Sequence, residues 1–285
     1  MSKFVEHHFR SRDGLKLCYR EYPGDVHKVP VLCLAGLTRH SGDFARLAAS
    51  LAPTRRVICP DQRGRGRSQH DPNWLNYHPG TYVDDTWILL RELGLERVIV
   101  IGTSLGGVMA MLMASLRPRQ LAGVVLNDVG PELSITGSHR IQNYLGRMPH
   151  VANWDEAAAH LKETCGNLYP DFTPQLWREF ARNTYFEDEA GRIRLSYDTK
   201  LAELMRLLPY GAMPPMWYAY AALQSIPTLA IRGSLSDLLS VATFERMKRE
   251  KPDLVQFTVA NQGHAPLLHE ASCQDEIARF LSHLP

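Results

Sequence analysis

Residues 97–116 read RVIVIGTSLGGVMAMLMASL and carry no charge after the first position. The stretch is long enough to span a membrane, and Gly102 and Gly106 have the spacing of a transmembrane dimer face. Its two halves nevertheless have different patterns. Val98–Ile101 is a β-branched run typical of a strand buried on both faces, whereas Val108–Leu116 is typical of a buried helix and ends shortly before a proline. A strand, a glycine-rich turn and a helix indicate an α/β protein rather than a membrane span.

Short apolar strands and helices alternate over most of the remaining chain. The other predicted strands are Val5–Arg10, Leu15–Tyr22, Val31–Leu34, Val57–Cys59, Gly123–Leu126, Pro227–Ile231 and Leu254–Val259. The other predicted helices are Phe44–Leu51, Tyr82–Leu93, Val241–Arg249 and Leu268–His283. This alternation predicts a mostly parallel sheet with helices on both faces. The Asp13-Gly14 turn between the first two strands adds an antiparallel hairpin at one edge.

Residues 132–222 depart from this alternation. They contain no β-branched run and are rich in aromatic side chains, and helical stretches such as Trp154–Cys165 and Thr173–Asn183 alternate with proline and glycine breaks. The chain is therefore expected to divide into a core of residues 1–131 and 223–285 and an inserted helical cap of residues 132–222. We expect the cap to lie across the carboxyl ends of the strands, where open α/β sheets bind ligands.

The segment Gly102-Thr103-Ser104-Leu105-Gly106 matches the pattern Gly-x-Ser-x-Gly and joins the buried strand to the buried helix. A sharp turn at this place exposes the Ser104 hydroxyl above the sheet, and the flanking glycines leave room for the crowded backbone. The amides at the start of the helix favour negative charge that develops at the same point. Ser104 is therefore the predicted nucleophile.

A serine nucleophile needs a base and a group that orients the base. His264 follows the last predicted strand and is the candidate base, because functional residues gather in such loops. Asp237 and Asp128 each follow a strand and give the same chain order of serine, acid and histidine. We favour Asp237, since one helix and one strand separate it from His264 and place the two loops side by side. Asp128 is the alternative acid. If it is not the acid, its carboxylate is expected to bind backbone N–H groups at a helix start or in a loop where the inserted segment begins.

The sequence resembles the α/β-hydrolase superfamily, in its branch with a serine nucleophile and a helical cap. Besides the turn at Ser104, the matching segments are Ala35–Leu37, Asp61–Ser68, Arg232–Asp237 and Gly263–His264. They span nearly the whole chain outside the cap. The resemblance implies an eight-stranded sheet, a triad whose acid is Asp237, and an oxyanion hole formed by the backbone N–H groups of Leu37 and Leu105.

Two positions depart from the family pattern. The family often has His-Gly where this chain has Ala35-Gly36, and a histidine where it has Thr103. Neither change removes a backbone donor. Ser104, in place of an aspartate, argues against the haloalkane dehalogenases and epoxide hydrolases of the superfamily, which attack with a carboxylate.

Substrate contacts are harder to place, because the cap sequence contains no motif. Met213, Met216, Trp217 and Tyr220 precede the return to the sheet and are candidates for the pocket wall. Arg39 and His40 follow the oxyanion segment and are candidates for holding a substrate carboxylate. The alternative, which we favour, is that they form salt bridges at the surface. The run that contains Arg63, Arg65 and Arg67 lacks a phosphate-binding motif, and we expect a twisted loop with solvated arginines.

The composition narrows the class of protein further. Lys and Arg total 32 against 30 Asp and Glu, a balance that does not favour binding to nucleic acid or to a membrane surface. The five cysteines lack disulfide or metal spacing, and the amino terminus has no apolar signal core. We therefore expect a cytoplasmic monomer or homodimer that acts on a small molecule without a metal or other cofactor.

These features predict a serine hydrolase that cleaves a small or medium carboxylic ester, thioester or lactone through an acyl-serine intermediate. Two alternatives stay open. A C–C bond hydrolase that acts on vinylogous diketones from aromatic catabolism would use the same triad. A ligand sensor built on a hydrolase scaffold would keep the fold without turnover. Because the predicted catalytic groups lie outside residues 132–222, we expect the cap to set specificity rather than chemistry.

Overall fold

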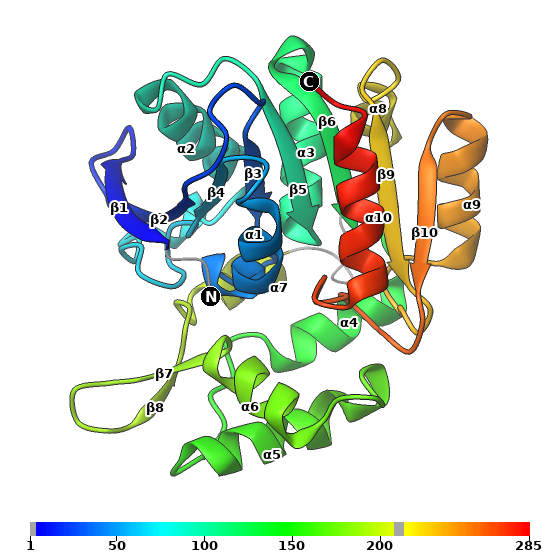
Figure 1. Ribbon diagram of the computed structural model, residues 1–285. Coiled ribbons are helices and arrows are strands. Elements are labelled where there is room, and N and C mark those ends of the chain that lie inside the picture. The colour runs from blue at the N-terminus through cyan, green and yellow to red at the C-terminus, as the bar shows by residue number, and fades with distance from the viewer. Residues whose placement is uncertain (1–3, 208–213) are drawn as a thin grey trace.

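The computed structural model describes residues 4–207 and 214–285. Its centre is an eight-stranded sheet in the order β1-β2-β4-β3-β5-β6-β9-β10 (Figure 1). The strands are β1 (Val5–Arg10), β2 (Lys16–Tyr22), β3 (Val31–Leu34), β4 (Val57–Pro60), β5 (Val98–Thr103), β6 (Leu121–Asn127), β9 (Thr228–Gly233) and β10 (Val255–Val259). Neighbouring strands from β4 to β10 are parallel, whereas β2 is antiparallel to both β1 and β4. The predicted mostly parallel sheet with a hairpin at one edge is confirmed.

Helices cover both faces of this sheet (Figure 1). One face carries α2 (Pro79–Glu92), α3 (Leu105–Leu116), α8 (Trp217–Ala221) and α9 (Val241–Glu250), and the other carries α1 (Ala45–Leu51) and α10 (Ala271–Ser282). The connections include the 3-10 helices η1 (Ser41–Phe44), η2 (Trp74–Asn76) and η3 (Pro118–Gln120). The uncharged stretch in the middle of the sequence divides into β5 and α3. In residues 4–207 and 214–285 no helix has both the length and the hydropathy to cross a membrane.

Between β6 and β9 the chain forms a separate group of short elements, drawn below the sheet in Figure 1. They are α4 (Ile135–Tyr144), α5 (Trp154–Cys165), η4 (Gly166–Leu168), α6 (Pro174–Arg182), β7 (Tyr185–Glu187), β8 (Ile193–Leu195) and α7 (Leu201–Arg206). A hydrophobic cluster of their own, which includes Tyr169, Trp177 and Tyr185, packs α5, α6 and β7 together. Besides the expected helices, this group contains a small antiparallel sheet in which β7 pairs with β8, which was not predicted from the sequence. Strands of three residues are too short to show an alternating pattern.

The helix α8 lies within the range 132–222 of the predicted cap but packs as part of the core. Ala219 and Tyr220 are buried in the same cluster as the side chains of α3 and the sheet. The division into core and cap stays a prediction, and α8 is a core helix by its packing.

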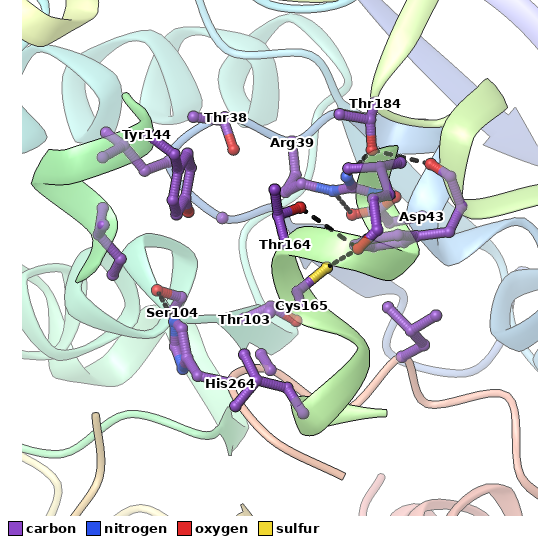
Figure 2. A pocket seen from close by; sticks show the side chains of 18 of the residues that line it. Thr38, Arg39, Asp43, Thr103, Ser104, Tyr144, Thr164, Cys165, Thr184 and His264 are labelled. Carbon is purple, nitrogen blue, oxygen red and sulfur yellow. Dashed lines mark hydrogen bonds and ion pairs between the residues drawn. The ribbon is translucent and has the colours of Figure 1, made fainter. Parts of the chain in front are cut away.

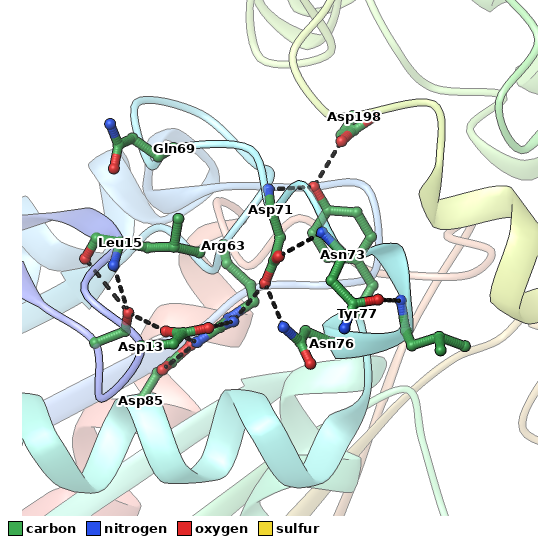
Figure 3. Close-up of polar contacts among 12 residues, drawn as sticks. Asp13, Leu15, Arg63, Gln69, Asp71, Asn73, Asn76, Tyr77, Asp85 and Asp198 are labelled. Atoms are coloured by element: carbon green, nitrogen blue, oxygen red, sulfur yellow. Dashed lines mark hydrogen bonds and ion pairs between the residues drawn. The ribbon is translucent and has the colours of Figure 1, made fainter.

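A buried arginine holds the loop that follows β4. The Arg63 guanidinium donates hydrogen bonds to the carboxylates of Asp13, Asp71 and Asp85 at 2.5–3.1 Å (Figure 3). The Arg63 side chain is 2% exposed, and the side chains of Asp71 and Asp85 are also buried. The three acids come from separate parts of the chain, so the cluster joins the β1–β2 turn, the loop and α2.

Arg65 in the same loop is also buried. Its guanidinium donates to the carbonyl oxygen of Leu37 at 2.8 Å and lies over the ring of Tyr82, 4.5 Å from the ring centre. The expectation of solvated arginines is therefore wrong for Arg63 and Arg65, whereas the side chain of Arg67 is 70% exposed. Local sequence could not reveal this difference, because Asp13, Asp85 and Leu37, which bind the buried arginines, are distant from them in the chain.

The Arg63 cluster predicts a difference in stability between two arginines of one loop. Arg63→Gln should lower the free energy of unfolding by about 3–5 kcal/mol, because it leaves buried carboxylates without a counter-charge. Arg67→Gln removes only an exposed pair with Glu6 and should change it by less than about 0.5 kcal/mol. Urea unfolding followed by circular dichroism measures both variants. Equal, small losses would show that the cluster does not hold the loop.

Candidate active site

Ser104 occupies the turn between β5 and α3 with φ 52° and ψ −115°, an unusual conformation for a residue with a side chain. Gly102 and Gly106 flank it where the backbone is most crowded. A Cβ atom at Gly102 would overlap the backbone of Gly106, and one at Gly106 would overlap the carbonyl group of Leu34 in β3. The two glycines therefore let strand, turn and helix approach closely enough to present the Ser104 hydroxyl.

His264 lies in the loop after β10 and connects Ser104 to a carboxylate. Its Nε2 atom is 2.9 Å from the Ser104 Oγ atom, and its Nδ1 atom is 2.8 Å from the Asp128 Oδ2 atom. Because an ionised carboxylate only accepts hydrogen bonds, Nδ1 carries the proton and the Nε2 lone pair faces the Ser104 hydroxyl. Figure 2 shows Ser104 and His264 turned toward each other.

Asp128 follows β6 directly and is fully buried, with a φ of 55°. The Gly233 N–H donates to its Oδ1 atom at 2.8 Å, and the Ser236 hydroxyl donates to its Oδ2 atom at 2.6 Å. Both carboxylate oxygens thus have polar partners although solvent does not reach them. These contacts hold the carboxylate in place beside His264.

The preference for Asp237 over Asp128 as the partner of His264 is wrong. The Asp237 carboxylate forms a two-point ion pair with Arg140 of α4, at 2.5 and 2.9 Å. Burial raises the pKa of Asp237, but the hydrogen bonds and charge of Arg140 outweigh this effect and hold that pKa below its ordinary value. Asp237 lies beyond a turn that follows β9, and its side chain meets the cap, whereas Asp128 stands at the end of its strand.

The predicted oxyanion donors, Leu37 and Leu105, belong to two segments that meet at Ser104. Leu37 lines the same cavity as Ser104, and Leu105 is the first residue of α3. In residues 4–207 and 214–285 neither backbone N–H has an acceptor in the protein. A Cβ atom at Gly36 would lie 3.7 Å from the Ser104 Cβ atom, so the Leu37 loop rests against the turn. The oxyanion role of the two N–H groups stays a prediction.

A cavity of about 380 Å³ adjoins Ser104 and His264. Its wall is mostly apolar and comes from the loop after β3, the His264 loop and the elements between β6 and β9. The side chains from those elements include Ile141, Tyr144, Leu161, Tyr169 and Phe180. The size and the apolar wall suit a small or medium organic ligand.

Arg39 and His40 do not both belong to this wall. Arg39 lines the cavity, but its guanidinium donates to both carboxylate oxygens of Asp43 at 2.6 and 2.7 Å and to the Thr184 hydroxyl at 2.6 Å (Figure 2). His40 lies outside the wall, and its Nδ1 atom accepts a hydrogen bond from the Gly42 N–H at 3.1 Å. Burial lowers the pKa of His40. Arg39 is thus already paired, and His40 is directed into the protein.

The other pocket candidates fall elsewhere. Met216, Trp217 and Tyr220 do not line the cavity, so their prediction is wrong. Their segment packs on the core around α8, and the Tyr220 hydroxyl donates to the carbonyl oxygen of Met247 at 2.9 Å. Met213 lies outside the described residues.

Sequence reasoning missed the side chains that do form the wall on the cap side. Arg140, Tyr144 and Arg147 come from α4 and the residues after it, and Tyr169 follows η4. The aromatic enrichment of residues 132–222 was the available signal. It could not select single residues, because a helical pattern does not state which face meets the sheet.

Metal-ligating side chains gather away from this cavity. Within the part of the chain that the structure describes, only Glu6, His8 and Cys18 lie close enough together to share an ion. They belong to the hairpin strands β1 and β2 and do not line the cavity. The expectation that the site acts without a metal or other cofactor stays a prediction.

Comparisons with known proteins place the fold in a family. A family model described as alpha/beta hydrolase fold matches residues 29–271. The chain is 32% identical over 259 residues to the 3-hydroxybutyrate-oligomer hydrolase of Cupriavidus necator, with 88% of this chain and 87% of that protein covered. It is 26% identical to the 2-(acetamidomethylene)succinate hydrolase of Mesorhizobium japonicum, with 82% and 81% covered.

A solved structure shows the same fold over the full length. The crystal structure of an alpha/beta hydrolase from Novosphingobium aromaticivorans matches with a TM-score of 0.94 at 41% identity and 99% coverage of both chains. The chain therefore belongs to the α/β-hydrolase family, as its sequence motifs predicted. Its enzyme class is hydrolase.

The contacts of His264 predict unequal effects of two aspartate substitutions. Asp128→Asn should lower kcat by about 10⁴-fold, because the amide no longer holds the imidazole in the required tautomer. Asp237→Asn should lower kcat by less than about tenfold, because His264 keeps its partner. Steady-state hydrolysis of a p-nitrophenyl ester measures both, with circular dichroism as the check of folding. The reverse ranking would restore Asp237 as the acid.

Proposed function

We propose that the protein is a serine hydrolase that cleaves a small or medium carboxylic ester through an acyl-serine intermediate. The observation that carries this proposal is the hydrogen-bonded chain from Ser104 through His264 to Asp128 beside the cavity. Thioesters and lactones present the same electrophilic carbonyl carbon and belong to the same proposal.

In the acylation step, the Ser104 Oγ atom attacks the carbonyl carbon while His264 Nε2 takes the hydroxyl proton. Negative charge develops on the carbonyl oxygen, and the N–H groups of Leu37 and Leu105 are the donors that stabilise it. One such preorganised donor lowers the activation free energy by about 3 kcal/mol. The imidazolium, stabilised by Asp128, then protonates the leaving alkoxide.

In the deacylation step, a water molecule takes the place of the leaving alcohol. His264 Nε2 removes a proton from this water, which attacks the acyl carbon, and the same two N–H groups receive the oxyanion. Collapse of the intermediate returns the proton to Ser104 Oγ and releases the acid. The Asp128 carboxylate stays ionised throughout and only orients and stabilises the imidazole.

A fluorophosphonate probe tests the nucleophile. Ser104→Ala should abolish both ester turnover and covalent labelling, because the probe reacts with an activated serine. Cys165→Ala is the matched control, since Cys165 also lines the cavity but burial raises the pKa of its thiol to about 11, which keeps it protonated. The control should label like the wild type. Labelling of Ser104→Ala would refute the proposal, and labelling without turnover of an ester, lactone and diketone panel would favour a ligand sensor.

The charges of the cavity favour an acidic substrate. Three arginines line the wall, and two of them are neutralised, Arg39 by Asp43 and Arg140 by Asp237. Arg147 forms no ion pair within residues 4–207 and 214–285, and residues 1–3 and 208–213 contain no acidic side chain. Arg147 is thus an exposed arginine of the cavity wall whose charge no carboxylate of the described residues neutralises, and a guanidinium can bind a carboxylate with two hydrogen bonds.

The names of two relatives also favour an acidic substrate. One is a hydrolase of 3-hydroxybutyrate oligomers and the other of a substituted succinate, so both names describe carboxylic acids. We propose short hydroxyacyl oligoesters with a free carboxylate as the substrate class, with that carboxylate at Arg147 and the ester carbonyl at Ser104.

A pair of substrates tests this assignment. Arg147→Gln should lower kcat/KM about tenfold for a 3-hydroxybutyrate dimer, because it removes the ion pair with the substrate carboxylate. The methyl ester of the dimer has no carboxylate, so its kcat/KM should not change. Arg182→Gln, at the end of α6 and outside the cavity wall, should change neither value. Equal losses on the dimer and on its methyl ester would show that Arg147 does not read the carboxylate.

A further inference from the structure

The elements between β6 and β9 contact the His264 loop on both sides of the imidazole. The Gly263 N–H donates to the carbonyl oxygen of Leu168 at 2.7 Å, and the Tyr169 hydroxyl donates to the carbonyl oxygen of Ala265 at 3.0 Å. Gly263 and Ala265 are the two chain neighbours of His264. Both backbone segments that carry the imidazole are therefore bonded to this part of the chain.

Two further observations show that this contact is close and extended. The Asn261 side-chain amide donates to the Asp171 carboxylate at 2.8 Å. A Cβ atom at Gly263 would lie 2.6 Å from the Leu168 Cβ atom, so any side chain there would collide with Leu168. We call Leu168–Asp171 the strap, and it lies directly on the loop.

Tyr169 is held firmly enough to position what it binds. It is 3% exposed, and its ring stacks on that of Phe172 with 4.6 Å between the ring centres. The ring also lies beside those of Phe180 and Trp177. Burial raises the pKa of Tyr169 well above its ordinary value, so the hydroxyl stays protonated and donates. The same side chain lines the cavity. The aromatic cluster thus fixes the Tyr169 ring, and the Tyr169 hydroxyl binds the His264 loop.

We infer that the strap positions His264 for Ser104 and that Tyr169 is the positioning residue. This inference rests on the proposed function. A displacement of about 1 Å at a reacting group costs about 10²-fold in rate, and the loop between β10 and α10 has no regular structure of its own to resist one. The cap therefore contributes to the chemistry as well as to specificity, in contrast to the expectation from the sequence.

Two buried tyrosines whose hydroxyls each donate to a backbone carbonyl oxygen provide a matched comparison. Tyr169→Phe should lower kcat about tenfold on a short p-nitrophenyl ester with KM within about twofold, because the hydroxyl contacts the loop and not the reacting atoms. Tyr220 is also buried but lies outside the cavity wall, and its hydroxyl donates to the carbonyl oxygen of Met247 at 2.9 Å. Tyr220→Phe removes the same kind of bond away from the site and should leave kcat within about twofold of the wild type.

The rate of Ser104 modification by a fluorophosphonate is the readout that a purely structural role would not change. It depends on alignment of the base and should fall with kcat in Tyr169→Phe, while the melting temperature measures folding separately. Asp171→Ala is a second variant that removes an exposed contact of the strap and so does not threaten the fold. It should lower kcat and the modification rate about threefold without a change in melting temperature.

Unchanged kcat and modification rate in both Tyr169→Phe and Asp171→Ala would overturn the inference, and so would an equal loss in Tyr220→Phe. Such a result leaves the proposed function standing if Ser104→Ala is inactive and the wild type turns over esters. Turnover by Ser104→Ala would instead refute the proposed function.

Discussion

The buried carboxylate of Asp128 joins three loops at the carboxyl edge of the sheet. It stands at the end of β6, accepts hydrogen bonds from Gly233 at the end of β9 and from Ser236 beyond it, and binds His264 after β10. A buried charge is stable only when such partners surround it, so each loop constrains the other two. The tautomer and direction of the imidazole, and hence the proposed chemistry, depend on this group, while the strap holds the backbone on either side.

The parts of the site that a local pattern encodes could be predicted from the sequence. The strand, turn and helix around Ser104 require close backbone approaches that only glycine permits, and Gly102 and Gly106 mark them two positions before and two after Ser104. The alternation of apolar strands and helices was enough for the sheet and its two helix layers. His264 was found because it lies in the loop after the last strand, and strand ends meet at one edge in a parallel sheet.

The parts that depend on side-chain direction could not be predicted. β6 and β9 are neighbours in the sheet, so both Asp128 and Asp237 come near the His264 loop. What separates them is the positive φ of Asp128 and the pairing of Asp237 with Arg140, which lies 97 positions earlier in the chain. The pocket wall was missed for a related reason, because the aromatic residues before β9 pack against α3 rather than over Ser104. No spacing in the sequence distinguishes these arrangements.

Nuclear magnetic resonance of ring-¹⁵N-labelled histidine tests the central claim most directly, because it observes the His264–Asp128 hydrogen bond itself. The account predicts one imidazole with a protonated Nδ1, an unprotonated Nε2 and a downfield Nδ1 proton. This signal should persist in Asp237→Asn and disappear in Asp128→Asn, with His264→Gln as the assignment control. A signal that survives in Asp128→Asn and is lost in Asp237→Asn would contradict the account.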